Sequence, residues 1–75
     1  MRNVRIAGTE YLVQGPLPSG AFILTGPRGG ELMARPFSND PTRAQVIRVP
    51  RRSFNWTPLM DGYGRQVIVN VADLA

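Results

Sequence analysis

The spacing of turn-forming residues is the feature that most constrains how this chain folds. Glycine, proline, asparagine and aspartate gather at intervals of about ten residues, and the segments between them are short and rich in Val, Ile, Leu and aromatic side chains. This pattern is typical of antiparallel strands joined by tight turns. We therefore expect a single all-β domain over residues 1–75: a small antiparallel barrel or sandwich of roughly six to seven short strands, SH3-like or of similar size, with no substantial helix.

Residues 22–37 carry the clearest of these patterns. Two apolar segments flank the sequence Gly-Pro-Arg-Gly-Gly. Pro27 has the φ that the second position of a type I turn needs, and Gly29 can adopt the left-handed conformation that closes a three-residue hairpin loop with a bulge. The sequence therefore predicts a β-hairpin that presents Arg28 at its tip.

The first strand of this hairpin is apolar on both faces. Phe22 and Leu24 face one way and Ile23 faces the other, because side chains alternate along a strand. A strand that is apolar on both sides is usually covered on both sides. We expect one face to lie on the domain's own core and the other to be covered by barrel closure or by a partner.

A first hairpin is expected over residues 2–14. Val4 and Ile6 share one face by period two, and a return strand begins after the turn. Gly8-Thr9 suits a two-residue type II′ turn, which favours glycine at its first central position. The hairpin is therefore predicted to turn at Gly8-Thr9.

The second half of the chain shows the same alternation of turns and strands. Asp40 is placed to cap a single helical turn that begins at Pro41. The other expected elements are a connector at 15–20, a strand at 44–49, an extended edge segment at 51–57, a hairpin at Asp61-Gly62 with a bulge at Gly64, a closing strand at 66–71 and a tail at 73–75.

The chain is short for a self-sufficient core. A domain of about this size buries only about 60% of its unfolded surface, and such domains are usually supported by a disulfide, a metal or a partner. There is no Cys and no His, so a disulfide and a thiolate metal site are excluded. A partner surface is the remaining common support.

Membrane insertion and secretion are not indicated by the sequence. No apolar segment approaches the roughly 18 residues of a membrane span. The N-terminus does not lead into the apolar region of a signal peptide. We expect a soluble protein, made in the cytoplasm and not secreted.

The residues that usually carry catalysis are missing. Without His, Cys or Lys, the chain lacks the common general bases and activated nucleophiles. The acidic residues are scattered, and neither Asp40 nor Asp61 has the spaced oxygen ligands of a calcium loop. We expect no enzyme activity, no catalytic residue, no cofactor, no metal and no small-molecule substrate.

The cations are unusual because all nine are Arg, against five acidic residues, which gives a net charge of +4. Arg is planar and weakly hydrated, so it is tolerated at protein interfaces and on phosphates better than Lys is. A genome rich in G and C would produce the same bias. The bias is therefore compatible with an interface but does not require one.

Residues 48–56 combine arginines with aromatic rings. If the chain stays extended past Pro50, then Arg48, Arg52, Phe54 and Trp56 lie on one face. Such a face suits single-stranded nucleic acid, or a protein interface, where Trp and Arg dominate binding. A third interpretation is that the rings are core and the arginines are solvated. The candidate partner-binding residues are Arg28, Arg48, Arg51, Arg52, Phe54, Trp56 and Ile23.

These observations rank three functional hypotheses. The first is a structural or interaction subunit that docks on a larger protein assembly or on copies of itself, for example a small accessory or decoration protein of a virus particle, which would make the chain virion-associated. The second is a small β-barrel that binds nucleic acid through its Arg and aromatic residues. The third is a small protein inhibitor of a host enzyme.

Overall fold

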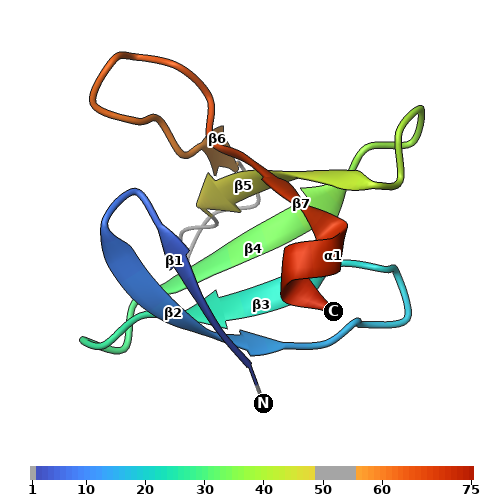
Figure 1. The fold of residues 1–75 in the computed structure, drawn as a ribbon, viewed down its shortest axis with the longest axis horizontal. Coiled ribbons are helices and arrows are strands. Elements are labelled where there is room, and N and C mark those ends of the chain that lie inside the picture. The colour runs from blue at the N-terminus through green and yellow to red at the C-terminus, as the bar shows by residue number, and fades with distance from the viewer. Residues whose placement is uncertain (1, 49–55) are drawn as a thin grey trace.

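A strongly curved antiparallel sheet makes up most of the structure, a computed structural model that describes residues 2–48 and 56–75 (Figure 1). Neighbouring strands pair in the order β1 to β6, and β7 pairs with β5 beside β6. The elements of the described residues are β1 (Arg2–Ile6), β2 (Thr9–Gln14), β3 (Phe22–Thr25), β4 (Glu31–Pro36), β5 (Arg43–Arg48), β6 (Thr57–Pro58), β7 (Ile68–Asn70) and α1 (Val71–Leu74). The expected all-β fold of short strands without a substantial helix is confirmed.

The strand register gives the sheet an inner and an outer face. Val13, Leu24 and Leu32 lie opposite one another on β2, β3 and β4, and all three are buried. Other residues that point inward from the strands, together with one residue of α1, complete the core. Its members are Ile6, Val13, Phe22, Leu24, Leu32, Ala34, Ala44, Val46 and Leu74. The prediction that Phe22 and Leu24 share a face is confirmed, and that face is the inner one.

The outer face carries an apolar row that crosses four strands. Ile23, Met33, Ile47 and Pro58 are successive partners in the register from β3 to β6. Ile23 and Met33 are half-buried, whereas Ile47 is only 1% exposed although it lies outside the core cluster. The second apolar face expected for β3 is therefore present, and it belongs to a row that spans the sheet.

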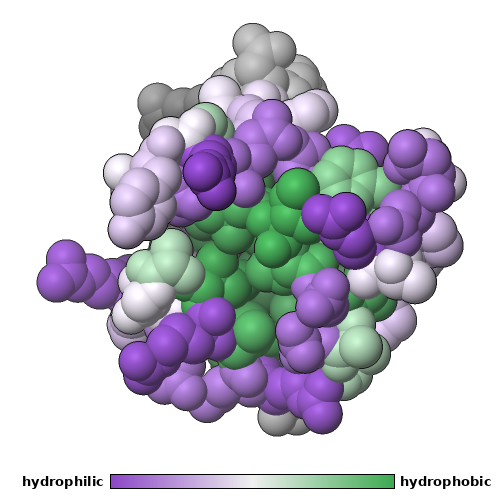
Figure 2. All heavy atoms as spheres, turned by 45° about the horizontal axis from the view of Figure 1, so that its top comes forward, coloured by the Kyte–Doolittle hydropathy of each residue, from purple (hydrophilic) through white to green (hydrophobic). Residues whose placement is uncertain are grey.

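The sheet is not closed between β1 and β7 in the described part of the chain. Apolar side chains line a hollow on this side of the molecule, and hydrophilic residues surround it (Figure 2). Partly buried residues from both borders of the opening pack on the core, among them Val4 on β1 and Val69 on β7. The inner face is therefore less completely covered here than under β3 and β4.

The first hairpin turns one residue earlier than the sequence predicts. Ile6 lies opposite Thr9, so the two loop residues are Ala7 and Gly8, with φ values of 51° and 83°. Two left-handed central residues define a type I′ turn. The predicted Gly8-Thr9 turn is wrong because glycine suits either the first position of a type II′ turn or the second position of a type I′ turn, and the flanking sequence does not distinguish them.

The central hairpin has the predicted turn. The Gly29 amide donates to the Gly26 carbonyl at 3.1 Å, and the Gly26 amide donates to the Gly30 carbonyl at 2.7 Å. Gly29 adopts a φ of 80°, which a side chain would disfavour. The predicted tip at Arg28 is confirmed.

Asp40 caps a single turn that begins at Pro41, as predicted, but this turn is a β-turn and not a helical one. Its Oδ1 atom accepts hydrogen bonds from the Thr42 amide at 3.2 Å and the Thr42 hydroxyl at 2.5 Å, and its carbonyl accepts from the Arg43 amide. The predicted capping by Asp40 is confirmed, whereas the turn is not helical, because β5 begins at Arg43 and the chain is already extended there. The side-chain hydrogen bond from Thr42, assisted by its amide and by the charge of Arg43, lowers the pKa of Asp40 against the opposing effect of desolvation.

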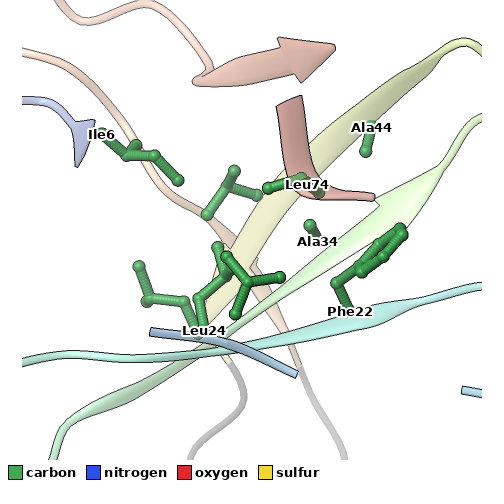
Figure 3. Packing of buried hydrophobic residues seen from close by; sticks show 9 residues of the cluster. Ile6, Phe22, Leu24, Ala34, Ala44 and Leu74 are labelled. Atoms are coloured by element: carbon green, nitrogen blue, oxygen red, sulfur yellow. The ribbon is translucent and has the colours of Figure 1, made fainter. Parts of the chain in front are cut away.

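The C-terminal residues belong to the core and do not form the predicted tail. Leu74 of α1 is 3% exposed and points into the cluster on the side of Ala34 and Ala44 (Figure 3). The helix lies against β1 and β7, and the Arg2 guanidinium donates to the carbonyl oxygens of Ala72 and Ala75. The sequence gives no sign of this because four residues are too few to show a periodic pattern.

Candidate functional site

The candidate partner-binding residues separate into two regions of the structure. Arg28 and Arg48 both line a groove at one end of the curved sheet. Ile23 and Trp56 lie on the outer face. Arg51, Arg52 and Phe54 lie outside the described residues.

The expectation that Arg48 and Trp56 share a face is wrong. Arg48 lies opposite Thr57 and therefore on the inner side, whereas Pro58 lies opposite Ile47 on the outer side. Trp56 borders an outer-face depression together with Ile47. The period-two argument fails because Arg48 belongs to β5 and Trp56 precedes β6, which runs antiparallel to β5, and the alternation of one strand does not carry over to another.

The groove has a volume of about 850 Å³. Thr9, Tyr11 and Arg48 occupy inner-face positions near the ends of their strands, and residues 26–32 form the remaining described wall. Leu74 and α1 lie with Ala44 near the beginning of β5, whereas Arg48 is at its end. The groove is therefore at the end of the sheet away from α1.

The wall of the groove is built on the contact between Tyr11 and Gly26. A Cβ atom added to Gly26 would lie 3.3 Å from Cε1 of Tyr11, so the absence of a side chain lets the turn approach the ring closely. Arg28 and Arg48 are exposed, and Glu31 is the acidic residue among the described lining positions. The groove thus combines an aromatic ring, two guanidinium groups and one carboxylate.

A second group of side chains lies on the outer face around Trp56. The guanidinium carbon of Arg35 is 6.0 Å from the centroid of the Trp56 ring, within the range of a cation–π contact. Gln45 donates through Nε2 to Oε1 of Gln66 at 3.0 Å, which links β5 to the following hairpin. The exposed Trp56 ring therefore lies beside the Arg35 guanidinium, in the same depression as Gln45.

The segment from residue 56 to residue 70, here called the exposed hairpin, presents large apolar side chains. Trp56, Met60, Tyr63 and Ile68 are 45%, 50%, 90% and 40% exposed, and they are the large hydrophobic residues that the described chain leaves exposed. Sequence reasoning included only Trp56 among the contact residues. The signal that would have found Tyr63 is an aromatic residue placed between two glycines in a predicted turn.

The exposed hairpin is joined to the edge of β5 by backbone hydrogen bonds. The Leu59 amide donates to the Val46 carbonyl at 2.9 Å, and the Val46 amide donates to the Val67 carbonyl at 3.1 Å. Leu59 and Val67 pack against the core from this position. The tip projects from the sheet between β6 and β7 (Figure 1).

The tip repeats the geometry of the central turn. The Gly64 amide donates to the Asp61 carbonyl at 3.1 Å, and Gly64 has a φ of 74°. Oδ1 of Asp61 accepts from the amides of Tyr63 at 2.8 Å and Arg65 at 3.0 Å. The predicted hairpin and its bulge at Gly64 are confirmed, but the loop consists of Gly62, Tyr63 and Gly64, so Asp61 flanks the loop and is not one of its central residues.

Comparisons with protein families, with curated proteins and with solved structures found no match. Among residues 2–48 and 56–75, no three or more acidic or other metal-ligating side chains cluster. In the same residues no helix has the length and apolar character needed to cross a membrane. The assignment of function therefore depends on the groove and the exposed hairpin.

Proposed function

We propose that this protein is a non-enzymatic interaction subunit that docks on a larger protein assembly, for example as an accessory protein of a virus particle, and that the exposed hairpin is its docking element. The observation that carries the proposal is the concentration of Trp56, Met60, Tyr63 and Ile68 in one hairpin. Scattered exposed apolar residues are normal on a protein surface, but a local group of them marks interaction sites.

The residue types fit the composition of binding surfaces. Aromatic residues, Met and Arg are enriched at protein interfaces, and Trp, Tyr and Arg dominate their binding energy. Arg35 lies beside the Trp56 ring and adds a planar cation to the apolar group. With a net charge of +4, the chain favours a partner surface that carries carboxylates around an apolar pocket.

The hairpin tip is preorganised for binding. The Asp61 carboxylate holds the amides of Tyr63 and Arg65, so the backbone under the Tyr63 ring is fixed before a partner arrives. Tyrosine itself has few rotatable bonds, which limits the entropy lost when it is immobilised. Both factors reduce the free energy spent on ordering the contact.

The proposal is tested by purifying a tagged form of the protein from the cells that produce it. We expect one abundant partner in a stoichiometric ratio. Tyr63→Ala and Ile68→Ser should each weaken the purified complex by at least tenfold, because truncation of an interface anchor costs about 2 kcal/mol or more. Asn70→Ala, an exposed polar position on the same hairpin, is the matched control and should bind as the unaltered protein does.

Two results would contradict the proposal. Unchanged binding by the Tyr63 and Ile68 variants would exclude the exposed hairpin as the docking element. Recovery of a single enzyme in small amounts, with its activity blocked, would identify an inhibitor and not a structural subunit.

A further inference from the structure

The groove between Tyr11, Arg28 and Arg48 is separate from the exposed hairpin and has a different chemistry. Its volume of about 850 Å³ falls within the range of small-ligand sites, which span about 300–1,000 Å³. The described lining residues come from the beginning of β2, from the central turn, from the beginning of β4 and from the end of β5. The fold therefore brings together side chains that are distant in sequence.

We propose that this groove binds a nucleotide, with the phosphate at the guanidinium groups of Arg28 and Arg48 and the base against Tyr11. Arginine forms paired, charge-assisted hydrogen bonds to phosphate oxygens through its planar fork. An aromatic side chain offers a surface on which bases of any sequence stack. The half-buried Thr9 hydroxyl lies in the same wall and adds a polar group next to the ring.

An acidic peptide matches the groove less well. Its carboxylates would satisfy the arginines, but they would leave the apolar surface of Tyr11 and Pro27 facing water. A nucleotide has an anionic phosphate at one end and a flat base at the other. The two arginines of the groove match the phosphate, and the Tyr11 ring matches the base.

The backbone that carries these groups is ordered before a ligand binds. Arg28 is carried by a turn that Gly29 closes with its left-handed backbone, and Tyr11 is in close contact with that turn at Gly26. Arg48 is the last residue of β5, where its backbone pairs with Thr57. A preorganised wall lowers the ordering cost of binding.

The test is a titration of the whole chain with adenosine monophosphate and, separately, with single-stranded hexaadenylate, followed by the amide NMR spectrum. We expect shifts at Thr9, Gly26, Gly29 and Gly30, with the Tyr63 amide unchanged. If adenosine monophosphate produces them, a free nucleotide is sufficient. If only hexaadenylate does so, the nucleotide is recognised within a strand. Either result supports the site.

A pair of variants at the two ends of β5 tests the phosphate contact. Two phosphate contacts predict that hexaadenylate affinity falls about sevenfold between 50 and 200 mM salt, because each contact contributes a slope of about −0.7 for single strands. Arg48→Gln should reduce this to about 2.6-fold, whereas Arg43→Gln, which removes the same charge at the other end of the strand, should leave it at about sevenfold. Equal melting temperatures of the two variants show that both remain folded.

Three outcomes would overturn the proposal. The first is no shift of the groove amides with either nucleotide probe. The second is equal binding of polyglutamate at the same amides, which would show a general anion surface. The third is an equal salt dependence for Arg48→Gln and Arg43→Gln, because the phosphate would then not lie at Arg48.

Discussion

Replacing Leu74 by Ala tests whether the C-terminal helix is part of the folded core. Leu74 is 3% exposed and belongs to the core cluster. Leu→Ala substitutions in cores cost about 2–5 kcal/mol, and the cost rises when the neighbours cannot fill the space. Ala34 and Ala44 have no atoms beyond Cβ to move into the gap, so we expect about 4 kcal/mol.

The stability that Leu74→Ala is expected to remove is large for a chain of 75 residues. At about 0.05–0.15 kcal/mol per residue, the total stability is about 4–11 kcal/mol. The unfolding entropy of about 2.1 cal/mol/K per residue gives about 0.16 kcal/mol/K, so a loss of 4 kcal/mol lowers Tm by about 25 °C. The variant is therefore expected to be near the limit of folding at room temperature.

The assay is thermal and urea unfolding followed by circular dichroism. The matched control is Asp73→Asn, an exposed neighbour in the same helix, which should change stability by less than about 0.5 kcal/mol. If Leu74→Ala unfolds at the same temperature as Asp73→Asn, Leu74 is not a core residue. The packing of α1 on β1 and β7 would then not stabilise the domain.

Three further predictions concern single positions. Ala7→Asn should stabilise the protein by about 0.5–1 kcal/mol and raise Tm, because Ala7 has a φ of 51° and asparagine tolerates that conformation in a type I′ turn; a lower Tm would refute this. Because the pKa of Asp40 lies below its usual 3.8, its stabilising effect is present above that pH and is lost as pH falls through the lowered pKa; Thr42→Val should weaken this dependence in acid unfolding curves. Leu24→Ala should lower the free energy of unfolding in urea by about 3 kcal/mol, because Leu24 is 0% exposed on the inner face. Ile23→Ala should lower it by only about 1 kcal/mol, because Ile23 is half-buried on the outer face. Equal losses would contradict the assignment of the two residues to different faces.

The parts of the fold that the sequence predicts correctly are determined by neighbouring residues. The turn at Gly29 follows from the φ of proline and the freedom of glycine, which need no tertiary information. The alternation of Phe22, Ile23 and Leu24 follows from the pleat of a strand and is seen in their burial. Local conformational rules are therefore sufficient for the central hairpin.

The parts that the sequence does not predict depend on contacts between distant residues. Leu74 is buried because two alanines on β4 and β5 leave space for it, and nothing near residue 74 indicates that space. Arg48 lines the same groove as Arg28, which is 20 residues away in sequence, because the fold places the end of β5 at the same end of the sheet as the central turn. A strand pattern gives the face of a residue within its own strand but not after the chain reverses.

The two turns of equal geometry explain how one small sheet can carry the two sites that we propose. Each has a left-handed glycine at the same position, at Gly29 and Gly64, so their backbones present the preceding residue in the same way. The central turn folds against Tyr11 and places Arg28 in the groove, whereas the tip of the exposed hairpin leaves Tyr63 90% exposed. Since the surroundings and not the turns differ, Tyr63→Ala should leave nucleotide binding unchanged and Arg48→Gln should leave docking unchanged.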